Sequence, residues 1–243
     1  MTKVFIINLD LAKKQWAAIT KSAARHKINV QRVAGVDGTQ IPRDEWRNVD
    51  AKAFGFQHGR RIIPGEYGCY QSHLLALDVI IELNLPFAII AEDDVGFNSY
   101  FISEVTEALQ RSPKIHVLKL LSHRYAGFIK TGSNQSGRQY GRCLYGPQGS
   151  AACYAVTREG AIKLRSALNI MQLPFDLALE RGWKAKYAVY TTAENWVEFY
   201  DPYRLSQITN TYKYSKFFFP LRAPTAIFRT IDIVNRLVYA LAR

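Results

Sequence analysis

The sequence predicts an α/β protein in which helices flank a largely parallel sheet. Short apolar runs rich in β-branched residues occupy residues 4–7, 28–33 and 87–91, and runs of this length are typical of buried strands. Residues 11–26, between the first two runs, place Trp16, Ile19 and Ala23 at helical spacing. Strand, helix and strand at this spacing begin a βαβ unit, whose two strands are parallel.

Composition limits the class of protein and its partners. The 243 residues are 48% apolar and 21% charged, which predicts a globular chain with one large domain, or one domain and a small appendage. The formal net charge of +12 predicts an anionic partner: a nucleic acid, a phosphorylated small molecule or an anionic membrane surface. A cleavable signal and a run long enough to span a bilayer are both absent from the sequence, which predicts a soluble or peripheral protein.

The cysteines are few and widely separated. Cys69, Cys143 and Cys153 form no CxxC pair. Their spacing predicts neither a disulfide framework nor a zinc site, and the simplest expectation is a reducing cytoplasm.

The apolar run at 87–91 ends in three consecutive carboxylates, Glu92, Asp93 and Asp94. Like charges at the end of a buried strand repel one another and resist desolvation, so they favour a nearby cation or strong hydrogen-bond donors. Strand alternation predicts Glu92 and Asp94 on one side and Asp93 on the other. Oxygen ligands of this kind suit Mn²⁺ or Mg²⁺, with Asp93 left to hold a substrate hydroxyl. The alternative is a solvated strand-to-loop turn.

The remaining elements follow from caps, periodicity and apolar runs. Pro64 opens a helix whose inward face holds Leu74, Leu77 and Ile80, and Thr157 is placed to cap another. Residues 122–150 lack periodicity, which predicts a long loop. Its basic side chains either close over phosphates or lie in solvent. Further helices are expected at 100–110 and 158–168, and further strands at 115–121, 150–156 and 187–191.

Two acidic residues beyond residue 170 are candidates for a catalytic base. Asp176 follows Pro174 in the first turn of a predicted helix, where a structural role is as well supported as a catalytic one. Glu194 lies beside Trp196 after the last predicted strand.

The composition changes towards the C-terminus, so we divide the chain into residues 1–203 and a basic, aromatic tail, 204–243. Arg222, Arg229, Arg236 and Arg243 recur every seven residues, which on a helix forms one slowly drifting stripe. A basic amphipathic helix predicts attachment to an anionic membrane surface. The alternative is a terminal helix packed on its own domain.

Several stretches, taken together and in order, resemble glycosyltransferase family 25, which includes bacterial lipooligosaccharide galactosyltransferases. The matching stretches are 5–10 (FIINLD) with 32–38 (RVAGVDG), 64–73 (PGEYGCYQSH), 89–95 (IIAEDDV) and, more weakly, 149–161 leading to Pro174-Phe175-Asp176. The resemblance implies a GT-A-like, Rossmann-type fold and a UDP-sugar donor, most often UDP-galactose. It also implies a divalent metal, Mn²⁺ or Mg²⁺, and inverting transfer to a lipid-linked saccharide, and it ends near residue 180.

Carried over by position, the resemblance assigns roles to individual residues. Glu92 and Asp94 would hold the metal, and Asp93 completes the acidic motif. Where the family has an arginine-rich stretch, this sequence has lysines, so Lys13 or Lys14 would contact the phosphates. The donor pocket would include Asn8, Gly65, Glu66 and His73. The base is not assigned by the resemblance: inverting transfer requires a group that takes the proton of the acceptor hydroxyl, and Asp176 is the first candidate and Glu194 the second.

The resemblance and the tail together predict a cytoplasmic protein that is peripheral on the inner face of the bacterial inner membrane and acts on a glycolipid or oligosaccharide. A nucleic-acid-binding module is the alternative suggested by the net charge. It is disfavoured because the carboxylates would repel a phosphate backbone and no binding motif is present. A catalytically inactive scaffold of the same fold also remains open.

Overall fold

A computed structural model describes residues 2–199 and 215–242. Its strands are β1 (Lys3–Asn8), β2 (Val30–Ala34), β3 (Phe87–Glu92), β4 (Val95–Gly96), β5 (Val117–Lys119), β6 (Phe128–Ser133), β7 (Gln139–Cys143), β8 (Cys153–Thr157), β9 (Val189–Thr192) and β10 (Glu198–Phe199). Its α-helices are α1 (Lys13–Arg25), α2 (Ala51–His58), α3 (Pro64–Glu82), α4 (Phe101–Arg111), α5 (Arg158–Ala167), α6 (Phe175–Leu179), α7 (Gly182–Ala185) and α9 (Ala223–Leu241). Short 3-10 turns are η1 (Gly38–Gln40), η2 (Arg43–Glu45) and η4 (Phe219–Arg222).

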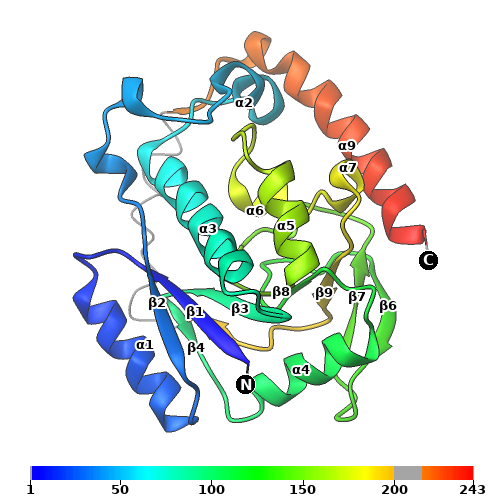
Figure 1. The fold of residues 1–243 in the computed structure, drawn as a ribbon. Helices are drawn as coiled ribbons and strands as arrows, with labels where there is room; N and C mark the ends of the chain where they lie inside the picture. Colours follow the sequence, from blue (N-terminus) through cyan, green and yellow to red (C-terminus); the bar gives the residue numbers. More distant parts are fainter. Residues whose placement is uncertain (1, 200–214, 243) are drawn as a thin grey trace.

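Eight strands form one mixed sheet in the order β2-β1-β3-β8-β5-β9-β7-β6 (Figure 1). β1 pairs in parallel with β2 and β3, and β5 pairs in parallel with β9. β8 and β7 run against their neighbours, so the other six strands point the same way. The predicted α/β class with a mostly parallel sheet and flanking helices is therefore confirmed.

Alternate residues of β3 divide the core into two halves. Ala88 and Ile90 pack with α3, α5 and α6 on one face of the sheet. Ile89 and Ala91 pack with α1 and α4 on the other. Because both faces of β3 are covered by helices, its sequence is a continuous apolar run. This central strand carries the three carboxylates at its end.

Most predicted elements are present, with ends shifted by a few residues. The Thr157 side chain accepts from the backbone N–H of Gly160 and caps α5, as expected. The predicted loop at 122–150 instead contains the hairpin of β6 and β7, which the absence of clear alternation concealed. The helix α2 was also missed. The predicted boundary at 203/204 lies outside the described residues, so the division of the chain stays a prediction.

α9 packs with two of its charged residues, Asp232 and Arg236, turned inward. Arg236 is buried, and its Nη1 lies 3.0 Å from Oε2 of Glu180. Asp232 pairs with Arg181 at 2.8 Å. Tyr239 donates its hydroxyl to the carbonyl of Tyr187 at 3.0 Å. These contacts fix the helix against α7 and the edge of the sheet (Figure 1).

The outward face of α9 is apolar, contrary to the expected basic stripe. Six large aliphatic residues of α9 are between 46 and 65% exposed; they are Ile227, Ile231, Ile233, Val234, Val238 and Leu241. The expectation was wrong for Arg236, because the buried carboxylate of Glu180 requires a cation from this helix. Arg243 lies outside the described residues.

We expect Arg236→Ala to lower the free energy of unfolding by about 3 kcal/mol, because it leaves Glu180 buried with one cation fewer. Arg229→Ala, on the same helix but exposed, is the matched control and should change stability by less than about 0.5 kcal/mol. Urea unfolding of both variants measures the difference. Equal stabilities would show that the Glu180 contact does not hold α9.

Candidate active site

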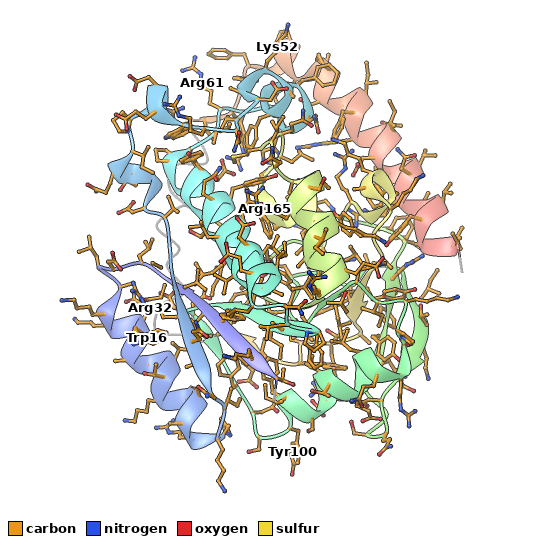
Figure 2. The ribbon with its side chains drawn as sticks, in the orientation of Figure 1. Trp16, Arg32, Lys52, Arg61, Tyr100 and Arg165 are labelled. Atoms are coloured by element: carbon orange, nitrogen blue, oxygen red, sulfur yellow. The ribbon has the colours of Figure 1, made fainter. Side chains whose placement is uncertain are left out.

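The site begins where two parallel strands end side by side. Ile7 of β1 is paired with Glu92 of β3, so Asn8 lies at the same edge of the sheet as the carboxylates. Asn8 donates from Nδ2 to Oδ2 of Asp93 at 2.6 Å and accepts at Oδ1 from Nε of Arg32 at 2.9 Å. Arg32, labelled on β2 in Figure 2, also binds Asp10. Asn8 therefore connects the first two strands to the acidic segment.

The acidic segment is a turn, since β3 ends at Glu92. The sequence predicted that the three carboxylates alternate along a strand. This prediction was wrong, because Asp93 and Asp94 lie in the turn that follows β3. Burial raises the pKa of Asp94 to about 7, with Glu92 and Asp93 adding to the shift. Burial also raises the pKa of Asp93, although the hydrogen bond that Asn8 donates to it lowers this pKa in part. The structure thus brings the three carboxylates together in a partly desolvated corner.

Oδ1 of Asp94 is buried and accepts no hydrogen bond from the described residues. A buried carboxylate oxygen without a donor is costly unless a cation or a ligand satisfies it. Three mutually repelling carboxylates with one unsatisfied oxygen fit a hard divalent cation, which takes oxygen ligands. Glu92 and Asp94 are the residues that would hold it, and their roles as ligands stay a prediction.

Two side chains of α3, one helical turn apart, face Glu92. Nε2 of His73 lies 3.3 Å from Oε1 of Glu92, and Sγ of Cys69 lies 3.9 Å from the same oxygen. Nδ1 of His73 is 3.2 Å from the Tyr154 hydroxyl, and its ring stacks on Phe175 with centroids 4.1 Å apart. His73 is fully buried. A role for His73 in the donor pocket stays a prediction.

Glu66 and Gly65 lie in the first turn of α3. Glu66 is buried in a bidentate ion pair with Arg60 and accepts from the N–H of Ile63 at 3.2 Å. These contacts cap the helix and use both oxygens of Glu66. They account for this residue without a donor sugar, and a role for Gly65 and Glu66 in the donor pocket remains a prediction.

Two glycine motifs of the sequence meet backbone to backbone. A Cβ on Gly68 would lie 2.3 Å from the Val36 carbonyl oxygen, and a Cβ on Gly38 would lie 2.0 Å from the Pro64 carbonyl oxygen. Only glycine fits such an approach. The contact seats α3 against the turn after β2 and so sets the position of Cys69 and His73 relative to the acidic turn.

Lys13 and Lys14 are exposed at the start of α1, in the segment that follows Asn8. Asn8 donates from Nδ2 to the Ala12 carbonyl at 3.0 Å and fixes this entry to the helix. The lysines thus lie on the first turn of the helix that follows the candidate site. Their contact with phosphates stays a prediction.

The two candidate bases have different surroundings. Burial raises the pKa of Asp176, the charge of Glu180 adds to the rise, Lys119 opposes it, and Glu92 contributes. Asp176 therefore shares the electrostatic environment of the acidic turn. Glu194 is exposed and lies 3.2 Å from Nε of Arg138, which also pairs with Glu104. The raised pKa favours Asp176 over the exposed Glu194 as the base, and both roles stay predictions.

A buried network that the sequence analysis missed supports this corner. Nζ of Lys119 lies 2.7 Å from Oε1 of Glu180, and both side chains are almost completely buried. Glu180 also accepts from the N–H groups of Gln148 and Gly149, at 3.1 and 2.9 Å. Although burial raises the pKa of Glu180, Lys119 and Arg236 together lower it below its ordinary value. A lysine within the apolar run 117–121 was the available signal.

The sequence profile of glycosyltransferase family 25 (LPS biosynthesis protein) matches residues 1–179. The chain belongs to glycosyltransferase family 25. The match covers β1 to α6 and includes the glycine motifs, Asn8, the acidic turn and Asp176. α9 and Glu194 lie beyond it.

Several curated relatives share about a quarter of the aligned residues. A glycosyltransferase 25 family member of Aedes aegypti is 25% identical over 119 residues, 47% of this chain and 20% of that protein. Procollagen galactosyltransferase 1 of Danio rerio is 25% identical over 112 residues, 44% and 18% respectively. Human inactive glycosyltransferase 25 family member 3 is 29% identical over 103 residues, 41% and 17%. The matched part of the chain spans about a fifth of the length of these relatives.

Among solved structures, mouse xyloside xylosyltransferase 1 in its apo form aligns with 77% of this chain and 70% of that chain. The TM-score is 0.35 and the identity 9%. An alignment this distant supports no inference about function.

The raised pKa of Asp94 has a measurable consequence in protein freed of metal. The folded state holds this proton more tightly than the unfolded chain, so its contribution to stability is complete below about pH 4 and is lost as the pH rises through about 7. Asp94→Asn carries no such proton. The free energy of unfolding of the variant minus that of the parent should therefore be at least about 1.4 kcal/mol larger at pH 8 than at pH 4.5.

Urea unfolding in EDTA at the two pH values measures this gain. Asp44→Asn, at an exposed carboxylate on η2, is the control and should show the same difference at both. A gain for Asp94→Asn that is absent, or that falls as the pH rises, would contradict the desolvated carboxylate corner.

Proposed function

We propose that the chain is an inverting glycosyltransferase that moves a sugar, most simply galactose, from a UDP-sugar to a saccharide hydroxyl. The observation that carries the proposal is the unsatisfied, buried oxygen of Asp94 beside Glu92 and Asp93. Family membership supports sugar transfer, and a relative named procollagen galactosyltransferase supports galactose. A GT-A arrangement of the donor site is part of this proposal.

A divalent ion, Mn²⁺ or Mg²⁺, held by Glu92 and Asp94 would supply positive charge to the departing diphosphate. Asn8 holds Asp93 in place for a sugar or ribose hydroxyl. Lys13 and Lys14, exposed at the start of α1, would add charge for the phosphates. In the transfer, the bond from the acceptor oxygen to the anomeric carbon forms on the face opposite the breaking bond to the diphosphate.

The acceptor hydroxyl must lose its proton as it attacks. Asp176 is the residue we assign to this role, because its raised pKa makes the carboxylate a better proton acceptor than an exposed aspartate. Glu194 is the second candidate, but it lies in an exposed ion pair with Arg138.

We expect UDP together with Mn²⁺ to stabilise the parent protein, by about 2.7 kcal/mol at a hundredfold excess over Kd. Asp94→Ala should lose this stabilisation and lower UDP-galactose turnover at least about 100-fold, because such an ion contributes several kcal/mol to the transition state. Thermal unfolding and release of UDP are the measurements. Asp44→Ala is the control and should retain both.

The outcomes separate the alternatives. Stabilisation by UDP and Mn²⁺ with no turnover of any UDP-sugar would indicate an inactive scaffold, the class named for one human relative. Salt-sensitive binding to generic DNA, with no response to UDP, would indicate a nucleic-acid-binding module. Unchanged turnover in Asp94→Ala would rule out its role in holding the metal.

We further propose that the outward face of α9 rests on an anionic membrane surface, which would present a glycolipid acceptor on the cytoplasmic side of a bacterial inner membrane. Among the helices of residues 2–199 and 215–242, none is long and apolar enough to cross a bilayer. An apolar helix face lying in the interface is the alternative way to attach. Figure 2 labels Lys52 and Arg61 around α2, against which α9 packs.

Charge favours a lipid surface over a second copy of the chain. Exposed cations lie on or next to α9 and the elements packed against it; they are Lys52, Arg61, Lys184, Lys186, Lys216 and Arg229. Anionic lipids attract such residues, whereas a second copy would bring another net charge of +12. The outward face also carries no acidic residue to pair with a neighbouring helix, because Asp232 faces Arg181.

We expect the double variant Ile231→Glu, Val238→Glu to bind anionic phosphatidylglycerol vesicles at least about tenfold more weakly, since two aliphatic side chains lose their apolar contact. Turnover of a soluble acceptor should not change. The control is the double variant Leu75→Glu on α3 and Leu83→Glu just after it, which alters two exposed apolar residues with the same change in net charge. Equal losses in both would attribute binding to bulk charge and contradict a role for α9.

A further inference from the structure

Cys69, His73 and Glu92 offer three different ligand atoms to one point. Their candidate donor atoms all lie within 4.8 Å of one another. The distance from His73 Nε2 to Glu92 Oε1 is 3.3 Å, and that from Cys69 Sγ to the same oxygen is 3.9 Å. Two donors come from one face of α3 and the third from the end of β3, so the fold itself assembles the group.

These separations match donors that share a small ion. Ligand bonds of about 2.0–2.1 Å from nitrogen or oxygen and about 2.3 Å from sulfur, arranged tetrahedrally, place the donors roughly 3.3–3.6 Å apart. The observed nitrogen–oxygen distance has this value, and the sulfur–oxygen distance exceeds the range by a few tenths of an ångström. The sulfur–nitrogen distance lies within 4.8 Å, so a bound ion would draw Cys69 towards His73 and Glu92.

The surroundings of His73 orient its Nε2 towards this point. Its Nδ1 lies 3.2 Å from the Tyr154 hydroxyl, and its ring stacks flat on Phe175. A hydrogen bond at one imidazole nitrogen fixes the ring and leaves the other free to bind a metal, the arrangement common around ligating histidines. The ring is fully buried, so its orientation is held by packing.

We propose that Cys69, His73 and Oε1 of Glu92 bind a zinc-class divalent ion, distinct from the hard cation that Asp94 and the other oxygen of Glu92 would hold at the acidic turn. Sulfur, nitrogen and oxygen donors select Zn²⁺ over Mn²⁺ or Mg²⁺, which prefer oxygen alone. A thiolate, a carboxylate and a neutral imidazole balance the charge of the ion. Three protein ligands leave a fourth position for water or a substrate oxygen. Cysteine spacing predicted no zinc site, because the third ligand is a distant carboxylate.

Cobalt(II) is the probe, added at one equivalent to reduced protein freed of metal by a chelator. The parent should give a near-ultraviolet thiolate-to-cobalt charge-transfer band, which Zn²⁺ then abolishes. Cys69→Ser should lose the band, and Cys143→Ser, at a buried cysteine on β7, should retain it. No band in the parent, or a band that survives in Cys69→Ser, would overturn the proposal.

Two further variants keep the test decisive. Tyr154→Phe preserves all three ligands and should weaken cobalt binding about 10- to 100-fold, as loss of a supporting hydrogen bond does; unchanged affinity would overturn the role of the Tyr154 contact. Asp94→Asn should retain the charge-transfer band while losing the response to UDP and Mn²⁺. Loss of both in Asp94→Asn would show a single shared ion and overturn the separate site.

Discussion

The repulsion among Glu92, Asp93 and Asp94 is the constraint on which the candidate site depends. A buried central strand delivers the three carboxylates to one corner, where burial and mutual charge raise the pKa of Asp94 to about 7. The fold holds them there by several separate contacts. Asn8 binds Asp93, His73 and Cys69 face Glu92, and helices cover both faces of the strand.

Another buried carboxylate of this chain, that of Glu180, is fully paired. Glu180 receives Lys119, Arg236 and two backbone N–H groups, and its pKa falls below the ordinary value. Asp94 receives no donor at Oδ1 from the described residues. Since the fold can satisfy a buried acid fully, as it does for Glu180, the incomplete pairing of Asp94 supports the proposal that a ligand completes it.

How far the sequence predicted this arrangement depended on whether a feature was local. Apolar runs marked β1 and β3, and Thr157 marked the start of α5, because strands and caps depend on adjacent residues. The hairpin of β6 and β7 was missed, since its glycines and polar residues interrupt alternation.

Contacts between distant segments could not be predicted from the sequence. In the sequence, Arg236 belongs to a basic stripe. In the structure it faces Glu180, which lies 56 positions earlier in the chain. Cys69 and His73 likewise reveal their common target only when α3 is placed beside the end of β3. The acidic motif itself was visible because its residues are consecutive, but the turn that gathers them was not.

β8 connects the two charged corners. Tyr154 pairs in register with Ile90 on one side and Lys119 on the other, and its hydroxyl contacts His73. On the far side, Lys119 meets Glu180, which is bound in turn by Arg236 of α9. The charges of Glu180 and Glu92 both raise the pKa of Asp176. Glu180, which the proposed membrane helix binds through Arg236, therefore also acts by its charge on the residue we assign as base. The docking of α9 thus contributes to the charge balance at that residue.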